Sequence, residues 1–113
     1  MAGLADRQCV PCKGGVPPLT GEQIAPLLAH LDGWNVVEKH HLEKRYKLKN
    51  FVQALDLVNR IGAIAEEQNH HPDIFLAWGR VDVKIWTHKI NGLTESDFVF
   101  AAKCDRAHAG INP

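Results

Sequence analysis

The segment EEQNHHPD, residues 66–73, sets two adjacent histidines one helical turn after a glutamate. Histidine changes its charge near neutral pH, so His70 and His71 could donate and accept protons. On a helix, Glu66 would lie one turn before His70 and could orient its imidazole, which suits acid/base chemistry. A histidine at a helix C-terminus is also favourable because of the helix dipole alone, so a purely structural role for His70 stands beside the chemical one.

A metal site is the second chemical interpretation, since His88 could join His70 and His71 as a third imidazole ligand. Zinc hydrolases often place two histidines at i and i+4 on one helix, but the residue four before His70 is Glu66. The spacing therefore favours proton transfer over metal ligation, and we expect no metal.

The CVPC motif contains Cys9 and Cys12 and is the other candidate for metal or redox chemistry. A structural zinc site needs four ligands, and Cys104 has no second ligand close to it in the sequence. A thioredoxin-like redox pair would follow a strand and begin a helix, and neither is predicted here. We expect two unpaired thiols in an irregular segment, with zinc binding and redox chemistry as the alternatives.

Composition excludes several broad classes of function. The 113 residues fit one domain, and the formal net charge of zero gives no general attraction to nucleic acid or to an anionic membrane. No apolar run approaches the roughly 20 residues of a membrane span, and none has the form of a signal peptide. Three cysteines, an odd number, favour a reducing compartment. We expect a cytoplasmic protein that binds neither nucleic acid directly nor membranes.

Helical periodicity marks the two ends of the predicted domain. Thr20 and Gln23 can form a capping box for a first helix that ends at Gly33, and Thr94 and Asp97 can do the same for a last helix. We expect the chain to divide into three parts: an irregular N-terminal lead at 1–19, a single domain at 20–105 and a frayed C-terminal tail at 106–113.

A central helix and two hairpins should lie between the outer helices. The helix begins after Asn50 and should end near Asn69 or His70, because Pro72 cannot continue the helical hydrogen bonds. Alternating apolar and polar residues predict the two strand pairs. These hairpins are expected at 34–49 and 74–88.

These elements predict an α+β fold: a four-stranded antiparallel sheet with three helices packed on one face, in the order α-β-β-α-β-β-α. His40 and His41 fall at the tip of the first hairpin, where we expect a solvated pair. Trp86 falls on the face without helices, which indicates that a second subunit covers that face.

Together, the spaced residues resemble the signature of the pterin-4a-carbinolamine dehydratase family, also called 4a-hydroxytetrahydrobiopterin dehydratases. The resemblance covers roughly residues 19–105. It includes LDGW before the first strand, TH at the end of the fourth and GLTESD at the last helix. Its core consists of Glu66, His70-His71-Pro72, Trp78, His88 and Asp97.

The resemblance implies a function as well as a fold. Family members remove water from 4a-hydroxytetrahydropterin to give quinonoid dihydropterin, which recycles the pterin cofactor of aromatic amino acid hydroxylases. It implies no metal or bound cofactor, and a homodimer or homotetramer. An alternative within the same family is a non-catalytic, protein-binding role, such as a dimerisation cofactor of a transcription factor.

The resemblance also assigns roles to individual residues. It implies that His70, His71 and His88 are catalytic, with His70 and His88 as the main proton donor and acceptor. Asn69 stands where some members carry aspartate, which puts its part in substrate binding in doubt, and Asp97 could serve the helix cap instead. The implied substrate-binding residues are Glu66, which would also orient His70, Asn69, Thr87, Trp34 and Asp97.

Overall fold

The computed structural model describes residues 3–9 and 17–111, so Cys12 and most of the CVPC motif lie outside the described residues. Two short 3-10 helices accompany the main elements. In chain order, these are η1 Leu4–Asp6, α1 Gly21–Leu28, β1 Asn35–Val37, β2 His41–Lys47, α2 Phe51–Gln68, β3 Asp73–Ala77, β4 Arg80–Ile85, η2 His88–Ile90 and α3 Glu95–Ala109.

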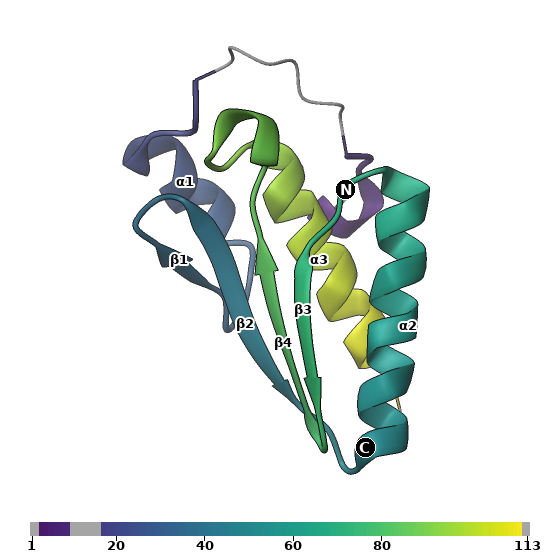
Figure 1. Cartoon of the computed structure of the whole chain (residues 1–113). Coiled ribbons are helices and arrows are strands. Elements are labelled where there is room, and N and C mark those ends of the chain that lie inside the picture. Colours follow the sequence, from purple (N-terminus) through teal and green to yellow (C-terminus); the bar gives the residue numbers. More distant parts are fainter. Residues whose placement is uncertain (1–2, 10–16, 112–113) are drawn as a thin grey trace.

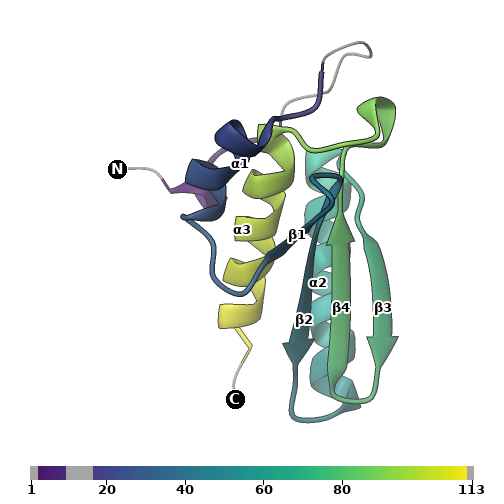
Figure 2. The same cartoon turned by 90° about the vertical axis from the view of Figure 1, so that its left-hand side faces the viewer.

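The four strands form one antiparallel sheet in the order β1-β2-β4-β3. The three helices lie on one side of this sheet, and α2 and α3 pack against its strands (Figures 1 and 2). The predicted fold class and element order are therefore confirmed.

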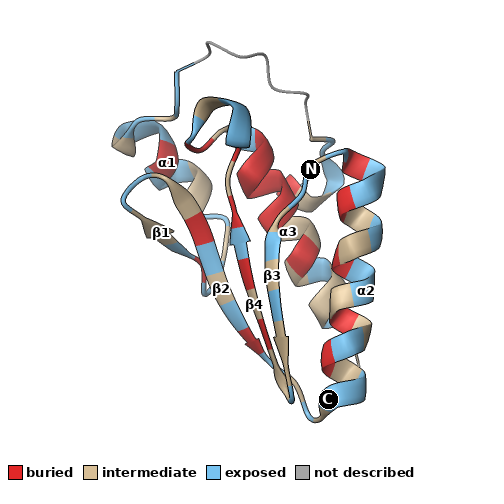
Figure 3. Ribbon diagram, in the orientation of Figure 1, coloured by how far each residue is buried: buried red, intermediate tan, exposed pale blue. Residues whose placement is uncertain are grey.

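Alternation along the strands separates a buried face from a charged one, as Figure 3 shows along β4. Val81, Val83 and Ile85 point toward the helices and are almost completely buried, whereas Asp82 and Lys84 lie on the opposite face. Because side chains alternate with a period of two, a one-residue shift in register would expose this apolar set. Burial against α2 and α3 thus fixes the position of β4.

Asparagine residues begin and end the central helix. The Asn50 side chain accepts a hydrogen bond from the backbone N–H of Gln53 at 2.9 Å. At the other end, Asn69 adopts the left-handed conformation, with φ 52° and ψ 44°, and its N–H donates to Ala65. The predicted end of this helix is therefore confirmed, and the chain leaves it in a new direction.

The outer helices differ in length from the expectations. The Thr20–Gln23 capping box is present, but α1 ends at Leu28 instead of Gly33. The prediction that residues after 105 fray is wrong for 106–109, which continue α3 to Ala109. Packing explains this extension, since Arg106 pairs with Asp6 of η1.

The start of the chain is also better anchored than its composition indicates. Leu4 is buried in the core, and Lys103 Nζ donates to the carbonyl of Ala5 at 2.9 Å. The described residues 3–9 thus pack on α3 through η1.

Candidate active site

The centre of the site is a hydrogen bond of 2.6 Å between His70 Nε2 and Asp97 Oδ1. His70 follows the left-handed Asn69, so it lies beyond the end of α2 and not on its last turn. Asp97 lies in the first turn of α3 and is completely buried. A carboxylate in this place holds the imidazole in one orientation and one tautomer.

The second oxygen of Asp97 binds the segment that precedes His88. Asp97 Oδ2 accepts from the Thr87 hydroxyl at 2.8 Å and from the Thr94 backbone N–H at 2.8 Å. Asp97 therefore serves the helix cap and contacts His70 at once, so the capping role is confirmed and its part in substrate binding stays a prediction. One buried carboxylate joins the end of α2, the end of β4 and the start of α3.

Glu66 contacts a different histidine from the one predicted. Its Oε2 lies 2.5 Å from His71 Nε2, and both side chains are largely exposed. The prediction that Glu66 orients His70 is wrong, because Asn69 ends the helix in the left-handed conformation and turns His70 toward Asp97.

His88 lies at the start of η2, directly after the anchored Thr87. Its ring packs on the indole of Trp86, with ring centroids 4.4 Å apart. Within residues 3–9 and 17–111, the His88 ring has no hydrogen-bond partner. The structure connects it to His70 only indirectly, through Thr87 and Asp97.

His40 and His41 are not the solvated pair that the sequence predicted. Both rings pack against Trp86, at centroid distances of 5.3 and 6.1 Å, and their Nδ1 atoms are 3.0 Å apart. The strand register explains this contact, since the pairing of Leu42 with Ile85 brings the neighbouring His41 and Trp86 together. The sequence predicted that Trp86 lies on the sheet face without helices, but it did not predict the contact of Trp86 with His40 and His41.

Trp34 and Asn69 do not join the hydrogen-bonded centre. The buried Trp34 donates from Nε1 to Asp105 at 3.0 Å, and Asp105 lies about two helical turns after Asp97 on α3. The described contacts of Trp34 are thus those of a core residue and not of a substrate platform. Asn69 is exposed and ends α2.

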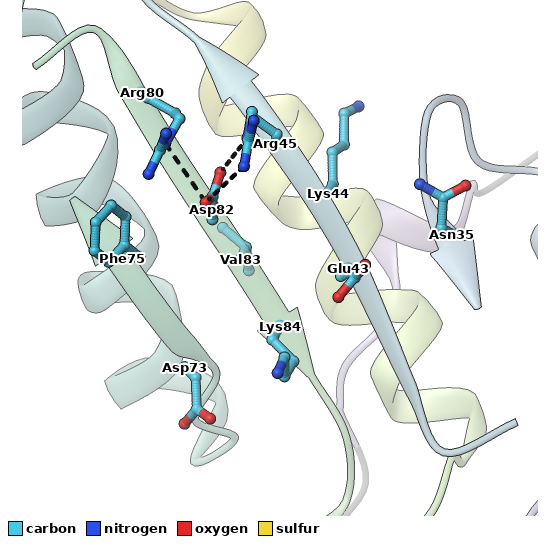
Figure 4. A pocket seen from close by; sticks show the side chains of 10 residues that line it. All are labelled: Asn35, Glu43, Lys44, Arg45, Asp73, Phe75, Arg80, Asp82, Val83 and Lys84. Atoms are coloured by element: carbon cyan, nitrogen blue, oxygen red, sulfur yellow. Dashed lines mark hydrogen bonds and ion pairs between the residues drawn. The ribbon is translucent and has the colours of Figure 1, made fainter. Parts of the chain in front are cut away.

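A groove of about 720 Å³ runs along the face of the sheet opposite the helices (Figure 4). Asp82 lies at its centre, paired with Arg45 at 2.9 Å and with Arg80 at 3.5 Å. None of the predicted site residues lines this groove, so its volume does not mark the histidine site. Its lining residues are Asn35, Glu43, Lys44, Arg45, Asp73, Phe75, Arg80, Asp82, Val83 and Lys84.

Metal ligands do not gather in the part of the chain that the structure describes, where no group of three or more His, Cys, Asp or Glu side chains could hold an ion. Across the same residues, none of the helices has both the length and the apolar character needed to cross a membrane.

Comparisons with known proteins agree with this fold and pattern of residues. The sequence model described as Pterin 4 alpha carbinolamine dehydratase matches residues 17–107. A protein of Rubrobacter xylanophilus is 61% identical over 106 residues, which cover 94% of this chain and 99% of the relative. A protein of Rickettsia canadensis is 55% identical over 93% of this chain and 97% of its own length. Both bear the name "Putative pterin-4-alpha-carbinolamine dehydratase".

One solved structure supports the same grouping, and a second shows the same fold. A structure described as a transcriptional coactivator/pterin dehydratase from Brucella melitensis is 35% identical, with a TM-score of 0.77 over 80% of this chain and 98% of its own. A pterin dehydratase-like protein described as a RuBisCO assembly factor of the alpha-carboxysome shares the fold. It has a TM-score of 0.61 and 23% identity, and the match covers 72% of this chain and 94% of that one.

The chain therefore belongs to the pterin-4-alpha-carbinolamine dehydratase family. The expected resemblance is confirmed, and so is the assignment to a family of dehydratase enzymes.

Proposed function

We propose that this protein removes water from a 4a-hydroxytetrahydropterin to give quinonoid dihydropterin, and so recycles the pterin cofactor of aromatic amino acid hydroxylases. The observation that carries the proposal is the hydrogen bond between His70 and the buried carboxylate of Asp97, which is an arrangement suited to proton transfer. Family membership supports the class of substrate.

The reaction requires two proton transfers. One proton is added to the hydroxyl group on C4a, and one is removed from the neighbouring N5. The C4a–O bond breaks, the N5 lone pair forms a double bond to C4a, and N5 loses its proton. The departing hydroxyl gains a proton and leaves as water. Acid/base groups that work near neutral pH can supply both transfers, each contributing about 10²- to 10⁴-fold.

The contacts of Asp97 support His70 as the group that takes the N5 proton. The Thr94 backbone can only donate to Asp97 Oδ2, so the carboxylate acts as an acceptor there. His70 Nε2 then donates to Oδ1, which leaves the lone pair on Nδ1 in the neutral imidazole. Nδ1 has no hydrogen-bond partner among the described residues, so it is available to accept a proton.

His88 and His71 complete the proposed set of proton carriers. His88 lies on an exposed loop and serves as donor to the departing hydroxyl, and His71 assists from the surface beside Glu66. We propose that Glu66, Asn69 and the Thr87 backbone bind the amino-pyrimidine edge of the pterin. Trp34 is left out of this proposed set because its indole is bonded to Asp105.

A direct assay tests this function. Purified protein should accelerate the decay of 4a-hydroxytetrahydropterin, followed by ultraviolet absorbance, and a chelator should leave the rate unchanged. A decay rate equal to that of buffer would contradict the dehydratase assignment and favour the alternative, a protein-binding role. The Brucella relative, which is described as both a coactivator and a dehydratase, shows that the alternative needs this direct test.

We further propose that the protein forms a homodimer or homotetramer. Trp86 no longer supports this expectation, because the histidines of the same chain cover it in part. Other apolar side chains are better support: Val52 on α2 is 75% exposed, and Trp78 after β3 is 71% exposed. Contiguous exposed apolar patches mark interaction sites, so these side chains are where we place the proposed contact.

A further inference from the structure

A hydrogen bond connects the β1–β2 turn to the loop that carries His88. His40 Nε2 lies 2.7 Å from Oδ1 of Asn91, the residue that ends η2 in the left-handed conformation. The backbone N–H of Asn91 donates in turn to the carbonyl of His88 at 3.2 Å. A side chain of the turn thus contacts the short helix of which His88 is the first residue.

The same histidine also reaches His88 through an aromatic contact. The indole of Trp86 packs against the His40 ring at a centroid distance of 5.3 Å and against the His88 ring at 4.4 Å. His40 therefore supports both the backbone that carries His88 and the indole on which the His88 ring packs.

The His88 ring needs support from elsewhere to hold one orientation. It is exposed, it starts a helix of three residues, and its nitrogens have no hydrogen-bond partner within residues 3–9 and 17–111. Asp97 fixes one end of the loop through the Thr87 hydroxyl. The His40–Asn91 hydrogen bond is the corresponding tie at the other end.

The hydrogen bonds around His40 define its tautomer. Asn91 Oδ1 is an acceptor, so His40 donates from Nε2. The Nδ1 of His40 lies 3.0 Å from Nδ1 of His41, whose Nε2 lies 3.5 Å from Glu43 Oε2. Both ring nitrogens of His40 therefore have partners within the same chain, so His40 is placed to support the loop and not to contact a substrate.

We propose that His40 is a positioning residue for His88, which it holds in place through Asn91 and Trp86. The proposal rests on the proposed function for its effect on catalysis, but the contact itself can be measured without the reaction. A group displaced by about 1 Å can lose a large part of its catalytic contribution, so a support of this kind affects kcat more than KM.

Three variants separate positioning from general loss of structure. His40→Ala removes the donor, and Asn91→Gly removes the acceptor at a position whose φ of 52° suits glycine. His40→Gln keeps an amide that can donate to Asn91 and accept from His41. His30→Ala is the matched control, because His30 is an exposed histidine just after α1.

We expect His40→Ala and Asn91→Gly each to lower kcat about 10-fold, with KM within about 2-fold of the original. The double variant should be no slower than either single one, because both changes break the same hydrogen bond. His40→Gln should recover most of the rate, and His30→Ala should match the original protein. Full additivity, or a His40→Ala rate equal to that of His30→Ala, would overturn the proposal.

The NMR chemical shifts of the His88 ring distinguish failure of this inference from failure of the proposed function. If the original protein is inactive as a dehydratase, the function fails and these chemical shifts alone decide the contact. His88 ring signals displaced by both His40→Ala and Asn91→Gly, but not by His30→Ala, support positioning. His88 ring signals that are the same in all of these proteins refute it.

Discussion

His70 and Asp97 are joined by a 2.6 Å hydrogen bond, and the Asp97 carboxylate is completely buried. His70 follows the end of α2 and Asp97 lies in the first turn of α3, 27 residues later, so the pair depends on the fold and not on local sequence. Asp97 Oδ1 contacts His70 at Nε2, so a change at Asp97 tests what this pair contributes to the proposed chemistry.

Asp97→Asn should lower kcat by about 10²- to 10⁴-fold, because the amide cannot accept from both sides as the carboxylate does. Either the amide presents its NH2 to His70 and can no longer accept from Nε2, or it presents its NH2 to Thr87 and Thr94, which then lose the acceptor for the hydroxyl and the backbone N–H. Steady-state kinetics of the purified variant checks this expectation.

The matched control for Asp97→Asn is Gln23→Ala, which removes the same kind of capping hydrogen bond from α1. We expect it to cost about 0.5–2 kcal/mol of stability while kcat is retained. If Asp97→Asn kept the full kcat, the role of the His70–Asp97 pair in catalysis would be rejected.

Glu66→Gln should alter the NMR chemical shifts of the His71 ring and leave those of the His70 ring unchanged, since the Glu66 carboxylate lies against His71. The pair is largely exposed, so the free energy of unfolding should change by less than about 1 kcal/mol. A larger change at His70 than at His71 would contradict the Glu66–His71 contact. It would instead support the prediction from sequence that Glu66 orients His70.

The sequence predicted the elements well because each carries its own local signal. The capping residues Thr20, Asn50 and Thr94 begin helices as expected, and the period-two alternation located the four strands. These features depend on neighbours within a few residues, which is the range over which sequence patterns are informative.

The side-chain partners were harder to predict because they depend on one backbone angle and on register. Glu66 contacts His71 instead of the predicted His70, because Asn69 adopts a positive φ. The surroundings of His40 were missed because Trp86 reaches it across two paired strands. The capping pattern of Thr94 and Asp97 predicted the position of the Asp97 carboxylate. No pattern near His70 in the sequence indicated that His70 would form a hydrogen bond with it.

Stability should fall as the pH rises above about 9, because the folded protein holds several acidic groups neutral. Burial raises the pKa of the Cys9 thiol to about 11 and raises the pKa values of Cys104 and Tyr46. A raised pKa means that the folded state keeps protons the unfolded state releases, so this stability is present below the unfolded pKa and lost above it.

Denaturant titrations at pH 8 and pH 10.5 measure this effect directly. Tyr46→Phe should make the loss smaller, since it removes one of the groups concerned, and should also cost about 1 kcal/mol because the hydrogen bond to Asp105 disappears. Stability that is equal at the two pH values would contradict the burial of these groups.

The proposed oligomer should have a mass in solution well above the 12.6 kDa of one chain. Light scattering at micromolar concentration measures that mass, and two variants locate the contact. Val52→Glu tests the exposed side of α2, and Trp78→Ser tests the turn after β3, because a charge or a lost aromatic ring weakens an apolar contact. A monomer mass for the original protein would refute the oligomer.

The central claim is that His70 and His88 carry the two proton transfers, and the decay rate of 4a-hydroxytetrahydropterin tests it most directly. The original protein should accelerate the decay, and the His70→Ala, His88→Ala double variant should lose about 10⁴-fold or more if each histidine contributes at least 10²-fold. The same double variant, folded and as fast as the original protein, would contradict the account.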